Sequence, residues 1–349
     1  MRKSRPRSHR ESIGCLNIHT AYGIGVESFQ EITTAAIDSR LDFIVITDRN
    51  TLRGQRLGME GWYDRTAVIV GEEVTRDDGH CLALGTREEI SEGDGHARDV
   101  LAEIERQKGI RVIMHPHAGE DPLNPGEDPS WRDWSEADAE ALALWTFLDD
   151  WKAGLTSWNF KKRLTDPALH LQGPKPETLA QWDAMLRERP VSAIALLDAQ
   201  GSKRRSRRSG SKIFSSRELF GTLRMHLFTP PFTRRFFEDK LAILDALKCG
   251  RGFLANDALA AAEGFRFEVR CSDGEVIPMG QPTPFRKGMT LRVLLPRCAA
   301  VRLISDGQAW FSKNDVTSLE VELNQAITVR LEARLGEKPW IFSNPIHIR

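Results

Sequence analysis

Residues 41–50 read LDFIVITDRN. Their centre, residues 43–47, is a short run of aliphatic and β-branched residues, which is typical of a strand buried on both faces. The run ends directly before Asp48 and Arg49. Similar runs of four to six residues recur along the first two thirds of the chain, at 15–18, 67–70, 81–84, 111–114, 141–145 and 192–197.

Helical patterns lie between several of these runs. Residues 27–40 place Phe29, Ile32 and Ala36 on one helical face, and residues 98–108 are followed by Gly109, a common helix terminator. Residues 176–187 begin with a proline, which suits a first helical turn. Alternation of strands and helices with short connections predicts a parallel α/β sheet, either open or closed into a barrel. Outside these segments, His226 also lies in a helical pattern.

The pattern changes after about residue 262. Short alternating runs follow one another with turn signals such as Asp273-Gly274 and Asp306-Gly307 between them, and no helical pattern intervenes. We therefore expect a small all-β sandwich over residues 262–349. Its predicted strands are 265–271, 290–295, 301–304, 318–323, 327–333 and 340–342.

Composition excludes several classes of protein. A length of 349 residues is consistent with about two domains. The 49 basic and 49 acidic residues cancel, so there is no overall field to attract nucleic acid or an anionic membrane. No run is long and apolar enough to span a bilayer.

The cysteines and the N-terminal segment indicate the cellular compartment of the protein. The five cysteines are dispersed and form no CxxC pair, which favours reduced thiols and a cytoplasmic protein. Residues 1–10 form a basic segment without the apolar core of a signal peptide, and we expect a disordered tail there. Residues 203–212, KRRSRRSGSK, are expected to form a solvated loop, and nucleic-acid binding through this loop is the alternative.

Candidate chemical groups follow the predicted strands at their carboxyl ends. Ligands of α/β sheets and barrels bind at this edge. A single carboxylate there can instead cap a helix, and a single histidine can simply be packed, but here five strands each offer a candidate. Histidine and carboxylate side chains together are the ligands of hydrolytic Zn²⁺, Mn²⁺ or Fe²⁺ sites. The candidates are His19, Asp48, Glu72 or Glu73, His115 and Asp198.

These segments resemble the successive motifs of the PHP (polymerase and histidinol phosphatase) superfamily. The similar segments are 16–20, 41–50, 71–73, 79–80, 114–116 and 197–200. In the tail, 256–259, 265–268 and 340–346 resemble the C-terminal module of the carbaryl-hydrolase-type branch of PHP metallohydrolases. The resemblance implies a distorted, TIM-like (β/α)7 barrel over residues 11–255, followed by the all-β sandwich. It also implies hydrolysis of a phosphoester, or of a carbamate or amide. Its implied metal ligands are His19, Asp48, Glu73, His80, His115 and Asp198.

Three positions depart from the pattern of the superfamily. Asn17, Arg49 and Gln200 stand where it has histidine ligands. An amide oxygen is a poor substitute for imidazole on Zn²⁺, and a guanidinium cannot bind a metal. Two interpretations follow. A reduced centre with one metal rather than three still hydrolyses a small anionic substrate, with Arg49 holding the phosphate and His117 as a nearby catalytic candidate. Alternatively the protein binds no metal and is a catalytically inactive binding or scaffold protein, in which Arg49 and a salt-bridge network replace the ions.

Overall fold

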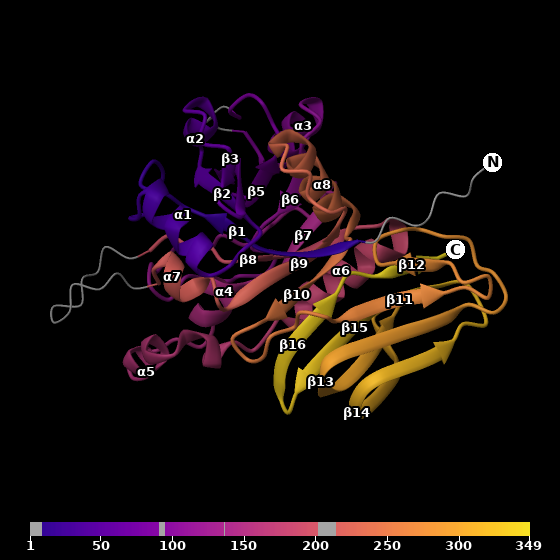
Figure 1. The fold of residues 1–349 in the computed structure, drawn as a ribbon. Coiled ribbons are helices and arrows are strands. Elements are labelled where there is room, and N and C mark those ends of the chain that lie inside the picture. The colour runs from indigo at the N-terminus through magenta and orange to yellow at the C-terminus, as the bar shows by residue number, and fades with distance from the viewer. Residues whose placement is uncertain (1–8, 91–94, 136, 202–213) are drawn as a thin grey trace.

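The computed structural model describes residues 9–90, 95–135, 137–201 and 214–349. It shows a mixed α/β protein with one large sheet (Figure 1). All seven runs predicted as strands in the first two thirds of the chain are strands, although their bounds differ by a few residues. They are β1 (Arg10–Ile18), β2 (Phe43–Arg49), β4 (Thr66–Arg76), β5 (Gly79–Leu84), β6 (Ile110–Ile113), β7 (Ala141–Thr146) and β8 (Ser192–Leu196).

These strands are neighbours in the order β1-β2-β4-β5-β6-β7-β8. The pairs β1–β2, β2–β4, β6–β7 and β7–β8 are parallel, as predicted. A short β3 (Gly61–Tyr63) adds to β4. The backbone just after β8 returns to β1, where Leu197 and Ala199 donate hydrogen bonds of 3.0 Å to the carbonyls of Leu16 and Asn17.

The prediction of a wholly parallel sheet is wrong at β5. Both β4–β5 and β5–β6 are antiparallel. Only Asp77 and Asp78 separate β4 from β5. Two residues can close a hairpin, whereas a parallel crossover needs a dozen or more residues. The hairpin brings the start of β5, with His80, beside the end of β4.

The helices begin and end where the sequence has capping signals. Helix α1 (Phe29–Asp38) has a capping box formed by Ser28 and Glu31 and buries Ile32. Helix α8 (Phe236–Cys249) ends at Gly250, whose φ of 68° is left-handed. The remaining helices are α2 (Arg53–Arg56), α3 (Ala97–Arg106), α4 (Phe147–Lys152), α5 (Phe160–Thr165), a 3-10 turn η1 (Pro167–His170), α6 (Pro176–Glu188) and α7 (Ser216–Leu219).

His226 lies on a strand, so the helical prediction for its segment is wrong. Strand β9 (Leu223–Thr229) pairs antiparallel with the first half of β1 and with β10 (Gly252–Asn256). Leu223, Met225 and Leu227 are all buried, and their alternation has the period of a strand. Pairing with two neighbouring strands determines the structure of this segment more strongly than its local helical pattern does.

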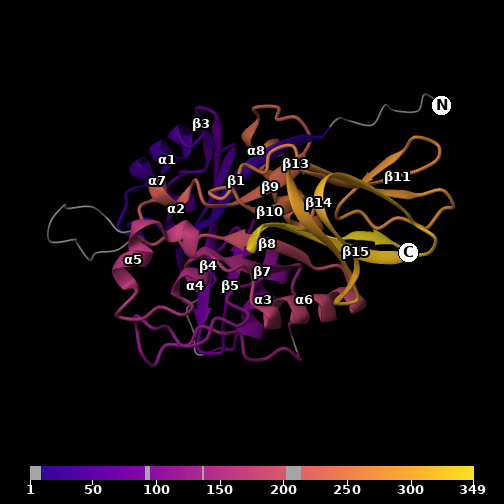
Figure 2. The same ribbon diagram turned by 90° about the horizontal axis from the view of Figure 1, so that it is seen from below.

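The C-terminal part is antiparallel throughout its ladders (Figure 2). The two predicted strands at 290–295 and 301–304 are one long strand, β13 (Thr290–Ser305), which shifts register where it pairs with β14 (Gln308–Glu322). The other strands are β11 (Arg266–Arg270), β12 (Val276–Pro278), β15 (Ile327–Leu335), β16 (Lys338–Ser343) and β17 (Ile346–Ile348).

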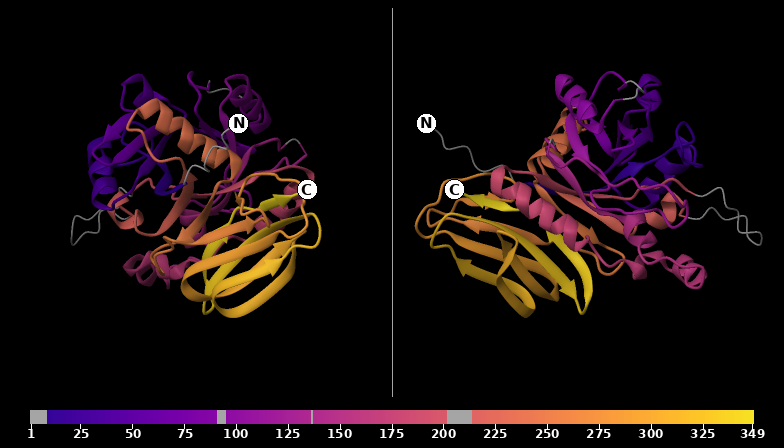
Figure 3. Two further views of the ribbon diagram at one scale, coloured as in Figure 1. Left: turned by 45° about the vertical axis from the view of Figure 1, so that its right-hand side comes forward. Right: turned by 180° about the vertical axis from the view of Figure 1, so that it is seen from behind.

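Strand β16 joins the two parts of the molecule. It pairs with β10 on one side and with β15 on the other. Helix α6 lies against the C-terminal strands from the other part of the chain (Figure 3, right), and Asp183 on this helix forms an ion pair of 2.7 Å with Arg330 on β15. Each part has its own apolar core. Within the described residues, no helix has the length and apolarity that a membrane span requires.

Candidate metal centre

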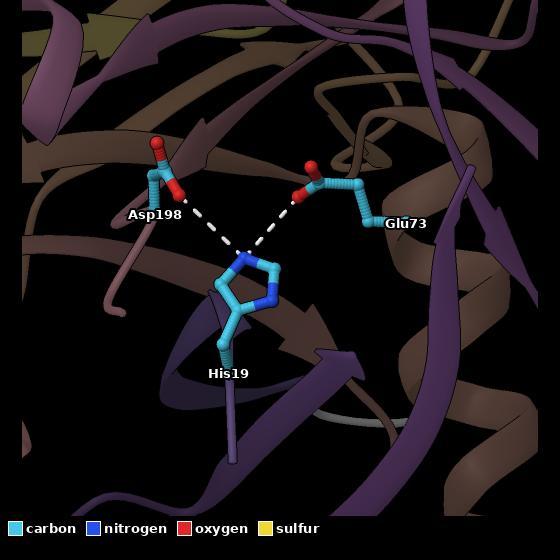
Figure 4. A group of neighbouring side chains, drawn as sticks. All are labelled: His19, Glu73 and Asp198. Atoms are coloured by element: carbon cyan, nitrogen blue, oxygen red, sulfur yellow. Dashed lines mark ion pairs between the residues drawn. The ribbon is translucent and has the colours of Figure 1, made fainter. Parts of the chain in front are cut away.

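Three buried side chains meet at the carboxyl edge of the large sheet. His19 follows β1, Glu73 lies near the end of β4, and Asp198 follows β8. His19 Nε2 lies 3.2 Å from Glu73 Oε2 and 3.5 Å from Asp198 Oδ1 (Figure 4). All three ligand atoms lie within 4.8 Å of one another. We call His19, Glu73 and Asp198 the ligand cluster.

The backbone at the strand ends is unusual for residues with side chains. Asn17, His115 and Asp198 have φ values of 60°, 47° and 52°, which lie in the left-handed region. Asparagine, aspartate and histidine adopt this conformation more readily than most residues that have side chains.

Glu72 and Glu73 point to opposite sides of β4, as their adjacency in a strand requires. Glu73 points into the cluster. Glu72 Oε2 instead accepts a hydrogen bond of 3.0 Å from the backbone nitrogen of Ile90, and burial raises the pKa of Glu72 to about 7. The prediction that only one of the two can face the site agrees with this geometry.

The ligand cluster is strongly coupled electrostatically. Burial alone would lower the pKa of His19, but the charge of Glu73 and hydrogen bonds to Asp198 and Glu73 outweigh burial and raise this pKa to about 9. Burial would raise the pKa of Asp198, yet its hydrogen bond with His19 lowers it to about 2. The positive charge of His19 holds the pKa of Glu73 well below its usual range in the same way.

Asn17, Arg49 and Gln200 all donate hydrogen bonds to the carboxylates of the ligand cluster. Asn17 Nδ2 donates to Glu73 Oε2 at 2.9 Å, and Arg49 Nε donates to Glu73 Oε1 at 3.1 Å. Gln200 Nε2 donates to Asp198 Oδ1 at 2.6 Å. Each of these three residues therefore supplies a hydrogen-bond donor to a carboxylate of the ligand cluster.

His80 and His115 lie beside the ligand cluster. Nδ1 of His80 is 3.6 Å from Glu73 Oε1, and the rings of His80 and His115 meet edge to face with centroids 5.3 Å apart. His115 Nδ1 pairs with Asp149 Oδ2 at 2.7 Å. Burial would lower the pKa of His115, but the charge and hydrogen bond of Asp149 raise it to about 9.

Two of the predicted site residues are engaged elsewhere. Asp48 accepts hydrogen bonds from the backbone nitrogen of Thr20 at 2.6 Å and from its hydroxyl at 2.7 Å, so both carboxylate oxygens are used by the loop after β1. His117 contacts Thr178 at 3.2 Å and stacks on Trp134. It lines a cavity between α6 and the C-terminal strands and does not line the cleft at the cluster, although Asp149 lines both.

An open cleft of about 670 Å³ lies over the site, and Arg49, His80, His115 and Asp198 line it. Sequence reasoning missed two further residues of this cleft, Asp149 and Lys152 on α4. The available signal was their position, because α4 directly follows strand β7 at the same sheet edge.

The donor set of the ligand cluster suits a divalent metal. One imidazole nitrogen and two carboxylate oxygens match the three-ligand sites of Zn²⁺, Mn²⁺ or Fe²⁺. In addition, the side-chain oxygen of Asn17 is buried and has no hydrogen-bond partner among the described residues. A half-turn of this amide would exchange its nitrogen and oxygen and present that oxygen to a cation.

Comparison with known proteins gives distant likenesses. No family model matches the chain. The uncharacterised protein MJ1587 of Methanocaldococcus jannaschii is 29% identical over 118 residues, which is 30% of this chain and 67% of that protein.

Two solved structures illustrate the structural likeness. A two-domain protein from Bacteroides vulgatus, described as containing a predicted PHP-like metal-dependent phosphoesterase, is similar over 97% of this chain and 96% of its own, with a TM-score of 0.47 and 13% identity. PsfC from Pseudomonas syringae is similar over 67% of this chain and 88% of its own, with a TM-score of 0.40 and 12% identity. The first description names the superfamily that the motifs of this chain resemble, and neither names the carbaryl-hydrolase-type branch.

Proposed function

We propose that this chain is a PHP-like metal-dependent hydrolase with a reduced metal centre, acting on a phosphoester or on a carbamate or amide. The observation that carries the proposal is the ligand cluster. Three buried ligand atoms from three separate strand ends converge within 4.8 Å of one another, next to an open cleft. Both carboxylates approach the same ring nitrogen of His19, Nε2, at 3.2 Å and 3.5 Å, so the three donors face one point that a cation can occupy.

In this proposal His19, Glu73 and Asp198 hold one Zn²⁺, Mn²⁺ or Fe²⁺. A bound metal of this kind lowers the pKa of a coordinated water toward neutrality and so supplies the nucleophile. His115 stands beside the site with its Nδ1 fixed by Asp149, so its other ring nitrogen is oriented to hold or accept a proton. His117 has no part here because it lines the other cavity.

Arg49 supplies positive charge for an anionic substrate. Its Nε donates a hydrogen bond to Glu73. Its side chain is 33% exposed and lines the cleft. In the part of the chain that the structure describes, its terminal guanidinium nitrogens have no hydrogen bond or ion pair. A guanidinium presented in this way binds phosphate oxygens in pairs and stabilises charge that develops on them. This favours a phosphoester over a neutral carbamate.

The finer description of the fold belongs to the same proposal. The hydrogen bonds from Leu197 and Ala199 to β1 bring the last strand of the series back to the first, which supports a distorted, barrel-like arrangement over residues 11–255. The antiparallel strands after residue 262 and their separate core support a C-terminal sandwich. The basic loop 203–212 lies outside the described residues.

Metal content tests the proposal. We expect about one Zn, Mn or Fe per chain, measured by inductively coupled plasma mass spectrometry after incubation with the metal and removal of the excess. His19→Ala should weaken metal binding by roughly 100-fold or more, because it removes the nitrogen ligand. His117→Ala is the matched control and should bind metal like the natural protein. A protein that takes up no metal under these conditions would refute the proposal.

A second candidate function is a metal-free binding or scaffold protein. The observation in its favour is that Asn17, Arg49 and Gln200 already satisfy the carboxylates. This alternative predicts that Asn17→His, Arg49→His and Gln200→His together raise the metal content from near zero. If the natural protein is already loaded and the triple variant gains nothing, the scaffold interpretation fails.

A further inference from the structure

A second cavity, of about 290 Å³, adjoins the ligand cluster. Its walls include Phe147 and Trp151 on α4, Phe160 and Leu164 on α5, and Phe214 before α7. The rings meet edge to face: Trp151 and Phe214 have centroids 4.7 Å apart, and Trp151 and Phe160 have centroids 6.2 Å apart. We call this cavity the aromatic pocket.

The aromatic pocket is continuous with the polar cleft. Asp198, a member of the ligand cluster, lines both cavities, and so do Gln200, Asn124 and Lys152. Lys152 and Asn124 are both bonded to Asp121, at 2.7 Å and 3.1 Å, which fixes them at the junction. A molecule whose anionic end binds Arg49 and a metal held by the ligand cluster therefore has an apolar cavity directly beside it.

Helix α5 presents an apolar face to this pocket. Phe160 and Leu164 are four residues apart, so they lie on the same side of the helix, and both are only half-buried. No residue of α5 is buried, and a helix of six residues is not stable alone. It is held to α4 by hydrogen bonds between Trp151 and Arg163, one of which, from the indole nitrogen to the carbonyl of Arg163, is 3.0 Å long. Its apolar side chains are thus incompletely packed where they face the cavity.

We propose that the aromatic pocket binds the apolar, ring-sized organic group of an anionic ester whose charged group lies at the ligand cluster. The inference rests on the proposed function and specifies its substrate class. A cavity of about 290 Å³ is at the lower end of the range for a whole ligand, and it therefore suits one group of a larger molecule. Ring edges and faces on several sides favour an aromatic group over a flexible chain.

Two non-hydrolysable probes test the pocket independently of turnover. Benzylphosphonate and methylphosphonate carry the same charged group and differ in the ring. Titration calorimetry on the Mn²⁺-incubated full chain should give about 10-fold or more tighter binding of benzylphosphonate, as burial of a phenyl ring predicts. In Phe160→Ala this preference should fall below about 3-fold, because much of the apolar wall is gone.

Trp158→Ala is the matched control. Trp158 is an aromatic residue two positions away that is 95% exposed and does not line the pocket, so its removal should leave the preference unchanged. Leu164→Ala is the second variant if Phe160→Ala does not fold, and it should also lower the preference. Equal binding of the two probes, undetectable binding of benzylphosphonate, or a preference that survives both Phe160→Ala and Leu164→Ala would overturn the pocket assignment.

A hydrolysis assay beside the calorimetry separates this inference from the proposed function. The substrate of this assay is phenyl phosphate, and the protein is the same. A ring preference without hydrolysis of phenyl phosphate supports the pocket and counts against the enzyme, whereas hydrolysis of phenyl phosphate without a ring preference does the opposite.

Discussion

His226 is a buried residue held between two carboxylates. It lies 3.0 Å from Glu11 and 3.1 Å from Asp257, and its side chain has no exposed surface. Burial would lower its pKa, but the hydrogen bonds to Asp257 and Glu11 raise the pKa of His226 above its usual range. These bonds connect β1 and the segment after β10 to β9, so the imidazole is a structural residue of the sheet.

We expect His226→Gln to lower the free energy of unfolding by about 2 kcal/mol at pH 6, because it removes the imidazolium shared by Glu11 and Asp257 and leaves them, among the described residues, only Arg266 and Arg224 as cationic partners. The pKa is higher in the folded state than in the unfolded state. The stabilisation is therefore complete below about pH 6.5 and is lost as the pH rises through the folded pKa. Urea unfolding at pH 6 and pH 9 should show a smaller difference between the two proteins at pH 9.

The control for this prediction is His170→Gln, which changes a half-buried histidine of η1. It should change the free energy of unfolding by less than about 0.5 kcal/mol at either pH. A difference between natural protein and His226→Gln that grows from pH 6 to pH 9 would contradict the raised pKa.

At the residue scale, the sequence predicts which side chains reach the edge of the sheet but not what they bond to. His19, Glu73 and Asp198 were identifiable because each follows or ends a buried strand. The engagement of Asp48 with Thr20 depends on how the loop after β1 folds back, which no spacing in the sequence specifies. Asp149 was missed because its contact with His115 joins residues 34 positions apart, which no local pattern indicates.

The loop between β1 and α1 packs closely behind His19. A Cβ atom on Gly25 would lie 2.1 Å from the carbonyl oxygen of His19 and 2.9 Å from that of Thr20. Both are backbone atoms, so the contact cannot be relieved by a side-chain rotation. We expect Gly25→Ala to displace the end of β1, to cost about 1–3 kcal/mol of stability, and to weaken metal uptake.

Thermal unfolding and metal content of Gly25→Ala test this expectation. Gly221→Ala is the matched control, because a Cβ atom there meets nothing within 4 Å, and both properties should stay close to those of the natural protein. If Gly25→Ala unfolds at the natural temperature and binds metal normally, the loop does not determine the position of His19.

At the element scale, the secondary structure is predicted correctly where the sequence pattern is local. The prediction fails where pairing between strands determines the structure. The sequence predicts a helix over residues 176–187, and α6 occupies Pro176–Glu188, because the proline and the apolar period of this segment are local signals. The residues of β9 were assigned to a helical pattern, although two neighbouring strands pair with them. Likewise, β13 continues through the Pro296–Arg297 region that appeared to separate two strands, because its two halves pair with different partners, β11 and β15.

At the scale of the whole molecule, the two parts are joined by more than a linker. Strand β16 continues the sheet from β10. Asn344 bonds to both the nitrogen and the carbonyl of Ala193 on β8, at 2.7 Å and 3.0 Å. Arg330 on β15 makes two hydrogen bonds to Asp183 on α6, of 2.7 Å and 2.8 Å. The domain boundary predicted near residues 255–262 therefore directly follows β10, a strand that pairs with β16 of the C-terminal part.

We expect the two parts to unfold together, and Arg330→Met tests this coupling. Arg330 is 4% exposed, and its loss leaves Asp183 buried without its partner, which should lower the free energy of unfolding by about 3–5 kcal/mol. The control, Arg302→Met, removes an arginine that is 49% exposed and pairs more loosely with Glu332, and it should cost less than about 1 kcal/mol. Hydrogen exchange in urea should show β8 and β13 losing protection at the same concentration in all three proteins. If Arg330→Met unfolds β13 while β8 remains protected, the C-terminal part is an independent unit and the continuity of the sheet through β16 does not couple the two.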